Sequence, residues 1–269
     1  MMMTANEKRD RLYDYLIKTD GISVAYSAGV DSTFLLKAAH DILGDKAIAV
    51  TAVSPFFQND EYEEAVSFCK AEGIRHIIIN TDPLGNEQIA SNPPDRCYLC
   101  KKAIFEQIKA VSAENGIYRV ADGSNTDDDN DYRPGRRALR ELGIESPLKE
   151  AGLSKADIRE LSKALSLPTW DKPALACLAT RIATGERLTP EKLSVIDSAE
   201  SFIRSLGIRQ VRVRMHGSIA RIETERQDIL HVAASDNAER IDGYLRSLGF
   251  TAVTLDLGGY RTGSMNIKG

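Results

Sequence analysis

A short turn of small residues joins an apolar strand to an apolar helix near the start of the chain, and it constrains the fold more than any other segment. The strand is predicted over residues 22–26, and residues 34–36 give the following helix its apolar side. Residues 25–33 between them read Ala-Tyr-Ser-Ala-Gly-Val-Asp-Ser-Thr. The first N–H groups of such a helix point outward and, with the helix dipole, attract an anion. The segment therefore predicts a strand-turn-helix unit that binds phosphate.

The residue types in this turn suit phosphate oxygens. Gly29 lets the backbone approach closely, and the side chains of Ser27, Ser32 and Thr33 add hydroxyl donors. The turn lacks the Gly-Lys-Ser/Thr ending of a Walker A motif, so no lysine is expected to grip the terminal phosphates. A helix capped by a Ser/Gly turn in an ordinary α/β protein is the alternative. The expected nucleotide ligands here are Ser27, Ala28, Gly29, Val30, Asp31, Ser32 and Thr33.

Composition sets wide bounds on function. The chain has 269 residues, enough for two ordinary domains. Its net charge of -4 gives no bulk attraction to nucleic acid or anionic membranes, so neither partner is expected. No apolar run approaches the roughly 18 residues that span a bilayer, and the first 20 residues lack a signal-peptide core. We therefore expect a cytoplasmic protein whose four cysteines are thiols or metal ligands.

Strands and helices alternate in the first half of the chain. Strands are predicted over residues 47–53, 76–80 and 116–121, with a helix after the first of them that carries Cys69 on its core side. This alternation predicts an α/β fold with a parallel sheet covered on both faces. Ligands of such sheets bind beyond the carboxyl ends of the strands.

A polar loop follows the last of these strands, at the same predicted edge of the sheet as the phosphate turn. It runs over residues 122–128 and offers Gly123, Ser124 and Asn125 to a nucleotide. Its acidic side chains, from Asp127 to Asp131, are suited to a magnesium ion on pyrophosphate. A solvated acidic loop is the alternative.

The second half of the chain predicts a smaller α/β unit. A helix over residues 150–167, capped near Ser154 with Asp157 three residues on, precedes it. Helices follow over residues 190–206 and 237–248, with strands over 210–215, 219–224 and 252–257. A turn at residues 184–186 marks the boundary. We expect a domain over residues 1–185 and a substrate-binding or oligomerisation domain over residues 186–269.

Three cysteines stand in conspicuous positions. Cys97 and Cys100 have the spacing of a metal half-site, and a helix is predicted to begin near Lys101. Cys177 lies in an apolar stretch that ends at Arg181. Taken alone, the first pair suits zinc, iron-sulfur or redox chemistry, and Cys177 suits a buried hydrophobic position. Cys69 is expected to pack in the core.

The motifs together resemble a known family. The turn at residues 27–32 is similar to the PP-loop of ATP pyrophosphatases, written Ser-Gly-Gly-x-Asp-Ser, with Ala28 in place of the middle glycine. Residues 173–186, residues 96–101 and the segment Gly-Tyr-Arg-x-Gly-Ser-Met-Asn at residues 259–266 resemble the LarE family over nearly the whole chain. The resemblance implies a PP-loop domain that cleaves ATP and a sulfurtransferase that converts carboxylates of pyridinium-3,5-biscarboxylic acid mononucleotide into thiocarboxylates. That reaction belongs to the synthesis of the nickel-pincer cofactor for lactate racemase-type enzymes.

The resemblance leaves two sources for the sulfur. Members with three cysteines resemble enzymes in which the thiolates hold a 4Fe-4S cluster, here Cys97, Cys100 and Cys177, with one iron open to an extra sulfide. Members with one cysteine give up the sulfur of the residue matching Cys177 and keep dehydroalanine. The cluster route is favoured here because all three cysteines are present.

Basic residues of the second half are candidates for the substrate phosphate. Arg212 and Arg214 alternate with apolar residues and share one strand face, where two guanidiniums suit a phosphate. Arg181 and Arg261 are further candidates, and a solvated strand face is the alternative. The same residues could contact RNA, as in the tRNA thiolases of the PP-loop superfamily, although the net charge disfavours this.

Other readings of the chain predict different partners. An amidotransferase-type synthetase would need a source of ammonia, and a nucleotide-binding protein without turnover would release no pyrophosphate. The LarE resemblance implies a homo-oligomer, such as a hexamer built from trimers, which no sequence pattern demonstrates. The donor of sulfide is unknown.

Overall fold

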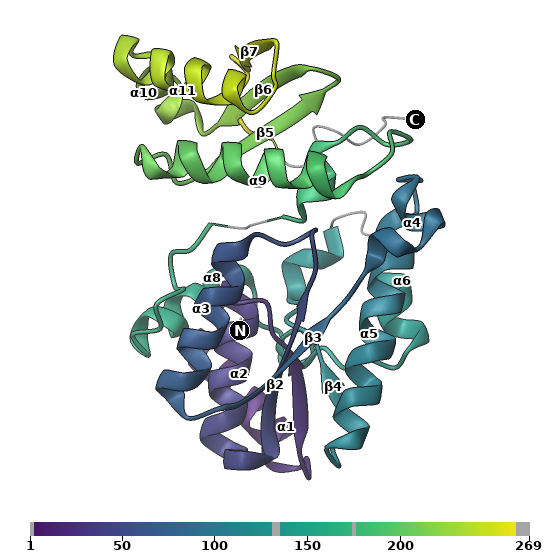
Figure 1. The fold of residues 1–269 in the computed structure, drawn as a ribbon. Helices are drawn as coiled ribbons and strands as arrows, with labels where there is room; N and C mark the ends of the chain where they lie inside the picture. Colours follow the sequence, from purple (N-terminus) through teal and green to yellow (C-terminus); the bar gives the residue numbers. More distant parts are fainter. Residues whose placement is uncertain (1–2, 131–134, 174–175, 262–269) are drawn as a thin grey trace. The chain divides into compact units, whose positions relative to one another are not determined.

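The computed structural model describes residues 3–130, 135–173 and 176–261, which form two compact units (Figure 1). The first unit comprises residues 3–54, 59–83, 95–130 and 135–173. The second comprises residues 55–58, 84–94 and 176–261. Each unit has its own sheet.

The first unit is built on a sheet of four parallel strands. The strands are β1 (Ile22–Ala25), β2 (Ala47–Val53), β3 (Arg75–Asn80) and β4 (Val120–Ala121), in the spatial order β3-β2-β1-β4. Ile22 pairs with Ala47, and Ser23 pairs with Val120, which places β1 at the centre. The central strands are buried and apolar, as expected where helices cover both faces. The predicted parallel α/β sheet is confirmed.

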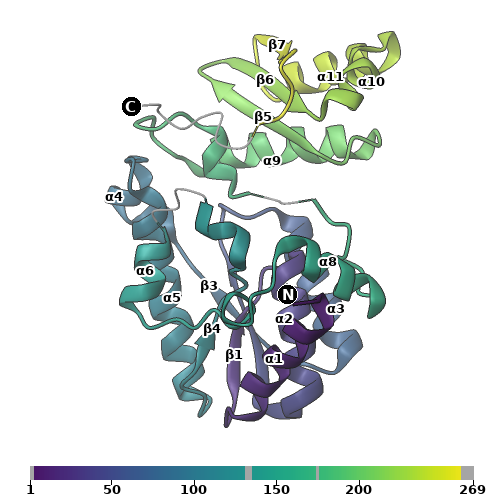
Figure 2. The same cartoon turned by 180° about the vertical axis from the view of Figure 1, so that it is seen from behind.

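Helices cover both faces of this sheet (Figures 1 and 2). One layer contains α1 (Ala5–Ile17), α2 (Val30–Leu43), α3 (Asn59–Glu72), α7 (Pro147–Glu150) and α8 (Lys155–Ala164). The other contains α5 (Arg96–Glu114) and α6 (Gly135–Glu141). Short 3-10 helices connect the elements at η1 (Gly44–Lys46), η2 (Pro83–Gly85) and η3 (Thr126–Asn130). The core below α2 consists of buried apolar side chains, among them Leu12, Val24, Phe34, Leu36, Phe68, Leu148 and Ile158.

Three predicted boundaries differ from the structure. The strand expected over residues 116–121 is paired only at Val120–Ala121, because Gly116 has φ +78° and Tyr118 lies in solvent. The helix expected over residues 150–167 is divided, since Gly152 at φ +81° ends α7 and the predicted capping box at Ser154 starts α8. The helix expected from Lys101 begins earlier, at Arg96. Cys97 and Cys100 therefore lie on a helix.

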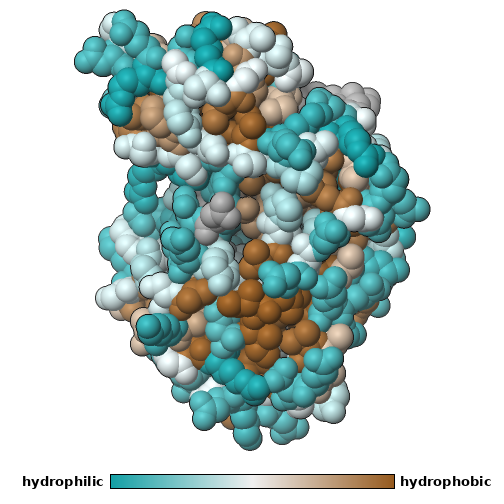
Figure 3. All heavy atoms as spheres, in the orientation of Figure 1, coloured by the Kyte–Doolittle hydropathy of each residue, from teal (hydrophilic) through white to brown (hydrophobic). Residues whose placement is uncertain are grey.

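Edge strand β3 carries apolar side chains to the surface. It has a hydrogen-bonded neighbour, β2, on one side in the described sheet, and Ile78 is 40% exposed. Figure 3 shows hydrophobic atoms gathered over the strands of the first unit, between α3 and α5. This surface is distinct from the carboxyl ends of the strands, where the phosphate turn lies.

The second unit contains a sheet of three strands with helices against it. Strands β5 (Val211–His216) and β6 (Ile219–Thr224) form an antiparallel hairpin through Gly217, and β7 (Ala252–Leu255) pairs with β6 in parallel. Helices α9 (Pro190–Ser205) and α11 (Ser235–Ser247) pack together through stacked rings of Phe202 and Tyr244. The remaining elements are α4 (Glu87–Ala90), η4 (Leu178–Arg181), η5 (Arg226–Asp228) and α10 (Ile229–Ala233). The expected smaller α/β unit is confirmed.

Candidate functional site

The turn between β1 and α2 has the backbone shape of an anion cradle. Ala28 has a left-handed φ of +51°, which costs a residue with a Cβ about 1–2 kcal/mol. Gly29 then takes the N-cap position without a side-chain cap, and its carbonyl accepts the N–H of Thr33 at 3.0 Å. The first N–H groups of α2 have no acceptor within the helix, and they lie just beyond the carboxyl end of β1. This turn therefore presents consecutive N–H groups to a bound anion.

The three hydroxyl groups of the turn have different environments. Ser32 is buried, and its Oγ donates to the Gly29 carbonyl at 3.2 Å and lies 3.2 Å from the Oγ of Ser27. Ser27 itself is exposed. Thr33 is fully buried and its hydroxyl contacts the hydroxyl of Tyr26 at 3.5 Å. Ser27 thus offers a solvent-facing hydroxyl, whereas Thr33 stabilises the turn from below.

Asp31 is paired with a lysine that the sequence did not indicate. Lys155 is the first residue of α8, and its Nζ lies 2.6 Å from Oδ2 of Asp31. Oδ1 of the same carboxylate is buried and accepts no hydrogen bond from the described residues. Burial raises the pKa of Asp31, and the charge of Lys155 opposes that shift. The turn therefore holds a partly buried carboxylate with an unsatisfied oxygen.

Gly123 brings the polar loop against the start of α2. A Cβ at this position would lie 3.0 Å from the backbone nitrogen of Ser32 and 3.3 Å from the Cβ of Asp31. The two loops predicted to share an edge of the sheet are thus in contact. Only a residue without a side chain permits this approach without displacement of the turn.

Hydrogen bonds within the polar loop fix its shape. Asp122 is buried and accepts from the hydroxyls of Ser124 and Ser146. Asn125 is also buried, and its Oδ1 accepts the N–H of Asp127 at 2.9 Å. Asp127 in turn accepts the N–H of Lys155 at 2.9 Å. The loop is therefore tied to the same lysine that pairs with Asp31. The predicted acidic residue Asp131 lies outside the described residues.

A second lysine contacts the phosphate turn. Nζ of Lys172 donates to the Ala28 carbonyl at 3.1 Å and pairs with Glu64 of α3. The Lys172 carbonyl accepts from Arg159 at 2.8 Å. Neither Lys155 nor Lys172 belongs to a motif with a recognisable spacing, so sequence patterns gave no signal for the two cations beside the turn.

Two of the three candidate metal-binding cysteines lie in the first unit. Cys97 and Cys100 lie three residues apart in the first turn of α5, so their side chains share one helix face. Cys97 is half-buried and Cys100 is buried. Gly135 starts α6 against this turn, where a Cβ would lie 3.2 Å from the Cys97 carbonyl oxygen. Cys69 lies on α3 and packs in the core of the first unit, as predicted, and burial raises the pKa of its thiol to about 12.

Cys177 lies in the second unit, immediately before η4. The residue is half-buried, and the next residue, Leu178, donates its N–H to the Phe56 carbonyl at 2.9 Å. The Cys177 carbonyl oxygen accepts the N–H of Thr180 at 3.0 Å and its hydroxyl at 2.8 Å. Ala174 and Leu175 of the same motif lie outside the described residues.

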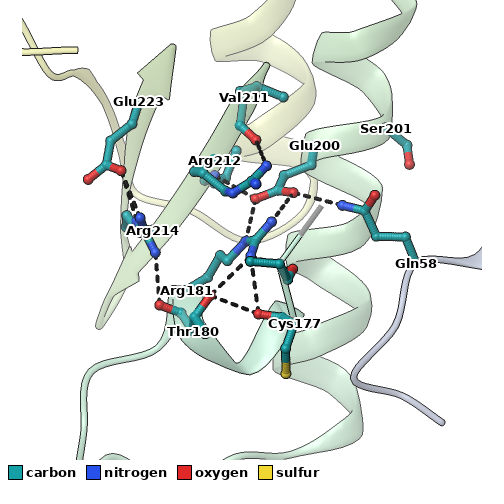
Figure 4. A network of polar contacts seen from close by, with 12 residues as sticks. Gln58, Cys177, Thr180, Arg181, Glu200, Ser201, Val211, Arg212, Arg214 and Glu223 are labelled. Carbon is teal, nitrogen blue, oxygen red and sulfur yellow. Dashed lines mark hydrogen bonds and ion pairs between the residues drawn. The ribbon is translucent and has the colours of Figure 1, made fainter. Parts of the chain in front are cut away.

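Arg181 is completely buried and binds Glu200 with both sides of its guanidinium. Nε lies 2.8 Å from Oε1 of Glu200, and Nη2 lies 2.9 Å from Oε2. Nη1 donates to the carbonyls of Ala176 and Cys177 at 2.6 and 3.1 Å (Figure 4). Glu200 also accepts from Gln58 and from the N–H of Val213, each at 2.9 Å. The group thus joins the Cys177 turn to α9 and β5.

Arg212 and Arg214 lie two residues apart on β5, as the alternating pattern predicted, but both are buried. Arg214 pairs with Glu223 at 2.9 Å and donates to the Thr180 carbonyl at 2.9 Å. Arg212 donates to the Val211 carbonyl. Burial, and next the charge of Arg181, lower the pKa of Arg212 to about 10. The second unit therefore concentrates three buried guanidiniums around the turn after Cys177.

The described part of the C-terminal motif packs on this cluster. The ring of Tyr260 has its centre 5.3 Å from the guanidinium carbon of Arg212. The backbone N–H of Tyr260 donates to the Thr224 carbonyl at 2.7 Å. Gly259 has φ +71°, and a Cβ there would lie 3.0 Å from the Thr224 carbonyl oxygen. Arg261 is exposed. Residues 262–266 of the motif lie outside the described residues.

The described residues contain neither a grouped metal site nor a helix suited to a membrane. Among residues 3–130, 135–173 and 176–261, no three His, Cys, Asp or Glu side chains are grouped as a metal site. Cys97 and Cys100 belong to the first unit and Cys177 to the second. No helix of the described chain combines the length and apolar character that a bilayer crossing requires.

Comparison with known proteins finds relatives along almost the full chain. Pyridinium-3,5-bisthiocarboxylic acid mononucleotide synthase of Lactiplantibacillus plantarum is 39% identical over 266 residues, which is 98% of this chain and 96% of that protein. An uncharacterized protein of Synechocystis sp. is 40% identical over 96% of this chain and 97% of its own length. An uncharacterized protein of Methanocaldococcus jannaschii is 31% identical over 91% of this chain and 92% of its own. No protein-family model matches the sequence.

These relatives agree with the resemblance carried by the motifs. The matches to the L. plantarum and Synechocystis proteins, at 39% and 40% identity, cover 98% and 96% of this chain. The parallel sheet with its glycine-containing turn after β1 is the fold that the motifs predicted. The chain belongs to the LarE family of pyridinium-3,5-bisthiocarboxylic acid mononucleotide synthases.

Proposed function

We propose that this chain is an ATP-dependent sulfurtransferase that acts on pyridinium-3,5-biscarboxylic acid mononucleotide in nickel-pincer cofactor synthesis. Its relative from L. plantarum is named for the bisthiocarboxylic product of such a transfer. The observation that carries the proposal is the contact between the turn at Gly29 and the loop at Gly123, at the carboxyl edge of the parallel sheet. Nucleotides bind at this edge in open α/β sheets.

The phosphates of ATP are assigned to the turn between β1 and α2. The N–H groups of Gly29 to Ser32 surround the anion, while the exposed hydroxyl of Ser27 adds a donor. The left-handed residue Ala28 turns the chain so that these amides converge. Gly123, Ser124 and Asn125 line the nucleotide from the neighbouring loop.

A magnesium ion fits beside this turn. Oδ1 of Asp31 is a buried carboxylate oxygen without a hydrogen-bond partner among the described residues, which is the type of ligand that Mg²⁺ prefers. Asp127 lies in the loop that contacts α2. The ion, when bound, would neutralise charge on the phosphates. Asp31 is the residue assigned to hold it.

Cleavage of ATP at the α-phosphate prepares the carboxylate for substitution. An oxygen of the substrate carboxylate attacks the α-phosphorus, and pyrophosphate leaves with the electron pair of the broken P–O bond. The carboxyl carbon then carries AMP, a far better leaving group than oxide. A sulfur nucleophile displaces AMP and forms the C–S bond. The chain supplies the turn that holds the phosphates in line for the first of these steps.

The phosphate of the mononucleotide is assigned to the arginines of the second unit. Arg212 and Arg214 project from neighbouring positions of β5, and exposed Arg261 follows Tyr260, whose ring contacts Arg212. Buried guanidiniums bind phosphate strongly because little water competes for their donors. Arg181 was also a candidate, but its donors are directed at Glu200 and at backbone carbonyls. The donors of Arg214 are likewise directed at Glu223 and at the Thr180 carbonyl, so the assignment rests first on Arg212 and Arg261.

Sulfide delivery is assigned to a 4Fe-4S cluster held by Cys97, Cys100 and Cys177. Two observations support this proposal: the three thiols form no disulfide, and two of them share one face of α5. The cluster would supply an iron with an open position for an extra sulfide. We further propose a homo-oligomer, and a cytoplasmic location that keeps these thiols reduced.

The test combines three measurements on anaerobically purified protein reconstituted with iron and sulfide. Pyrophosphate release, thiocarboxylate product and the mass of the chain are followed with ATP and the pyridinium mononucleotide, and with tRNA as the control acceptor. The proposal expects pyrophosphate and product with the mononucleotide alone, and several products per chain with Cys177 intact. Pyrophosphate release that depends on tRNA would contradict the proposed function, and so would binding of ATP without release of pyrophosphate.

The matched variants are Asp31→Asn and Asp45→Asn. Asp31→Asn removes the charge beside the phosphate turn and is expected to abolish pyrophosphate release. Asp45 lies in η1, at the opposite end of α2, and its replacement leaves release unchanged.

A further inference from the structure

The carbonyl oxygen of Cys177 accepts more hydrogen bonds than its turn requires. A 3-10 turn accounts for the N–H of Thr180 at 3.0 Å. The hydroxyl of Thr180 at 2.8 Å and Nη1 of Arg181 at 3.1 Å converge on the same oxygen. Figure 4 shows this oxygen facing the guanidinium while the sulfur points away from it. The guanidinium therefore acts on the backbone of Cys177.

The environment holds this guanidinium in a fixed position. Both Arg181 and Glu200 are fully buried, and a buried ion pair is stable only when its geometry and remaining hydrogen bonds are satisfied. Gln58 and the N–H of Val213 hold Glu200 at 2.9 Å each. Arg181 also donates to the hydroxyl of Thr180 at 3.0 Å. A preorganised cation directed at a peptide carbonyl stabilises negative charge that develops on that oxygen.

A cysteine residue develops such charge when its α-proton leaves. The electrons of the Cα–H bond delocalise onto the carbonyl oxygen as an enolate. They then form the Cα–Cβ double bond while the Cβ–S bond breaks, and the leaving sulfur takes the electron pair of that bond. The products are dehydroalanine in the chain and sulfur on the leaving group, with the proton passed to water. No oxidant or reductant is needed.

We infer that Arg181 and Thr180 form an oxyanion site for the Cys177 carbonyl and make Arg181 a catalytic residue for elimination of sulfur from Cys177. The inference rests on the proposed function, because the leaving group is the thiocarboxylate of the substrate. Sγ of Cys177 first displaces AMP from the activated carboxyl carbon, its proton going to water, and forms a thioester. Elimination across Cα–Cβ then releases the thiocarboxylate. An iron-free chain can thus complete one sacrificial transfer.

The test uses iron-free full-length protein, purified with a chelator, together with ATP and the pyridinium mononucleotide. Pyrophosphate release reports activation, and mass spectrometry of the chain reports both the thioester adduct and dehydroalanine at position 177. Wild-type protein is expected to pass from adduct to dehydroalanine with one product per chain. Arg181→Lys keeps the charge but loses the planar fork. It is expected to form adduct within about twofold of the wild-type rate and to convert it at least about tenfold more slowly.

Further variants separate catalysis from folding. Arg187→Lys is the matched control, since Arg187 is exposed in the same unit and pairs with Glu87. Thr180→Val removes one donor from the carbonyl, and should also cause the adduct to accumulate, whereas Thr180→Ser should recover most of the lost rate. Thr180→Val decides the matter if Arg181→Lys does not fold.

The outcomes are distinct. Conversion of adduct at the wild-type rate in both variants overturns the inference, as does intact Cys177 in iron-free wild-type protein that has made product. A raised KM for the mononucleotide without accumulation of adduct would instead assign Arg181 to the substrate phosphate and also overturns it. Wild-type protein that releases no pyrophosphate and forms no adduct removes the proposed function itself.

Discussion

Nζ of Lys155 lies 2.6 Å from Oδ2 of Asp31, and this contact joins α8 to the phosphate turn. The same lysine donates its N–H to Asp127 of the neighbouring loop at 2.9 Å. One residue therefore holds the two loops of the proposed ATP site together. Its ammonium occupies one side of a carboxylate whose other oxygen is buried and unsatisfied among the described residues.

Replacing Lys155 with methionine should reduce stability and make it depend on magnesium nucleotide. The change leaves the Asp31 carboxylate without its cation, and we expect the free energy of unfolding to fall by about 1–3 kcal/mol. Added Mg²⁺ and ATP should restore part of this loss, because the ion replaces the missing positive charge. Urea unfolding with and without Mg²⁺ and ATP measures both effects. Lys70→Met, at an exposed position of α3, is the control, and equal losses in the two variants would contradict the prediction.

Adding one methyl group at Gly123 should impair ATP turnover. The new Cβ would lie 3.0 Å from the Ser32 nitrogen, so the loop or the start of α2 must move. Since small displacements of a phosphate-positioning group cost large factors in rate, kcat/KM for pyrophosphate release is expected to fall at least about tenfold. Gly243→Ala on α11 is the control, because a Cβ there meets no atom within 4 Å. Unchanged kcat/KM in Gly123→Ala would contradict the nucleotide site.

Local sequence patterns predicted the elements of the site but not all of its contacts. The strand-turn-helix pattern located the phosphate turn, and the rule for parallel sheets placed the loop at Gly123 beside it. The capping box at Ser154 was also correct. The turn and the capping box depend on residues close in the chain, whereas the position of the Gly123 loop follows from a general rule for parallel sheets. The Asp31 to Lys155 pair joins positions that no periodicity connects, so it became visible only in the fold.

Burial of the arginines was likewise beyond the sequence. The alternation at Arg212 and Arg214 placed them correctly on one strand, yet basic residues on a strand usually face solvent. Glu223 from β6 pairs with Arg214, and the charge of Glu200 from α9, which pairs with Arg181, also acts on Arg212. Partners on another strand or helix cannot be assigned from the sequence without knowing how these elements pack.

Replacing Arg212 with lysine should weaken binding of the mononucleotide without affecting ATP. Lysine keeps a positive charge but loses the planar fork, which is proposed to bind two phosphate oxygens, and the contact with the ring of Tyr260. We expect KM for the mononucleotide to rise about tenfold, equivalent to about 1.4 kcal/mol. KM for ATP should stay within twofold. The comparison substrate is the nucleoside without phosphate, for which wild type and variant should have the same KM; a difference there would assign Arg212 to another part of the substrate.

Replacing Cys97 with alanine should remove iron but leave one transfer of sulfur. Cys97 lies on the first turn of α5 with Cys100, and loss of one of three thiolates leaves a cluster with too few protein ligands. After anaerobic reconstitution, iron content and visible absorbance should fall to background, and product should stop at one per chain. Cys69→Ala is the matched control, because Cys69 is buried in α3 and carries a thiol whose pKa is raised to about 12. It should retain iron at the wild-type level. Full iron content in Cys97→Ala would exclude this residue as a ligand, whereas loss of iron with repeated turnover would show that sulfide reaches the adenylate without the cluster.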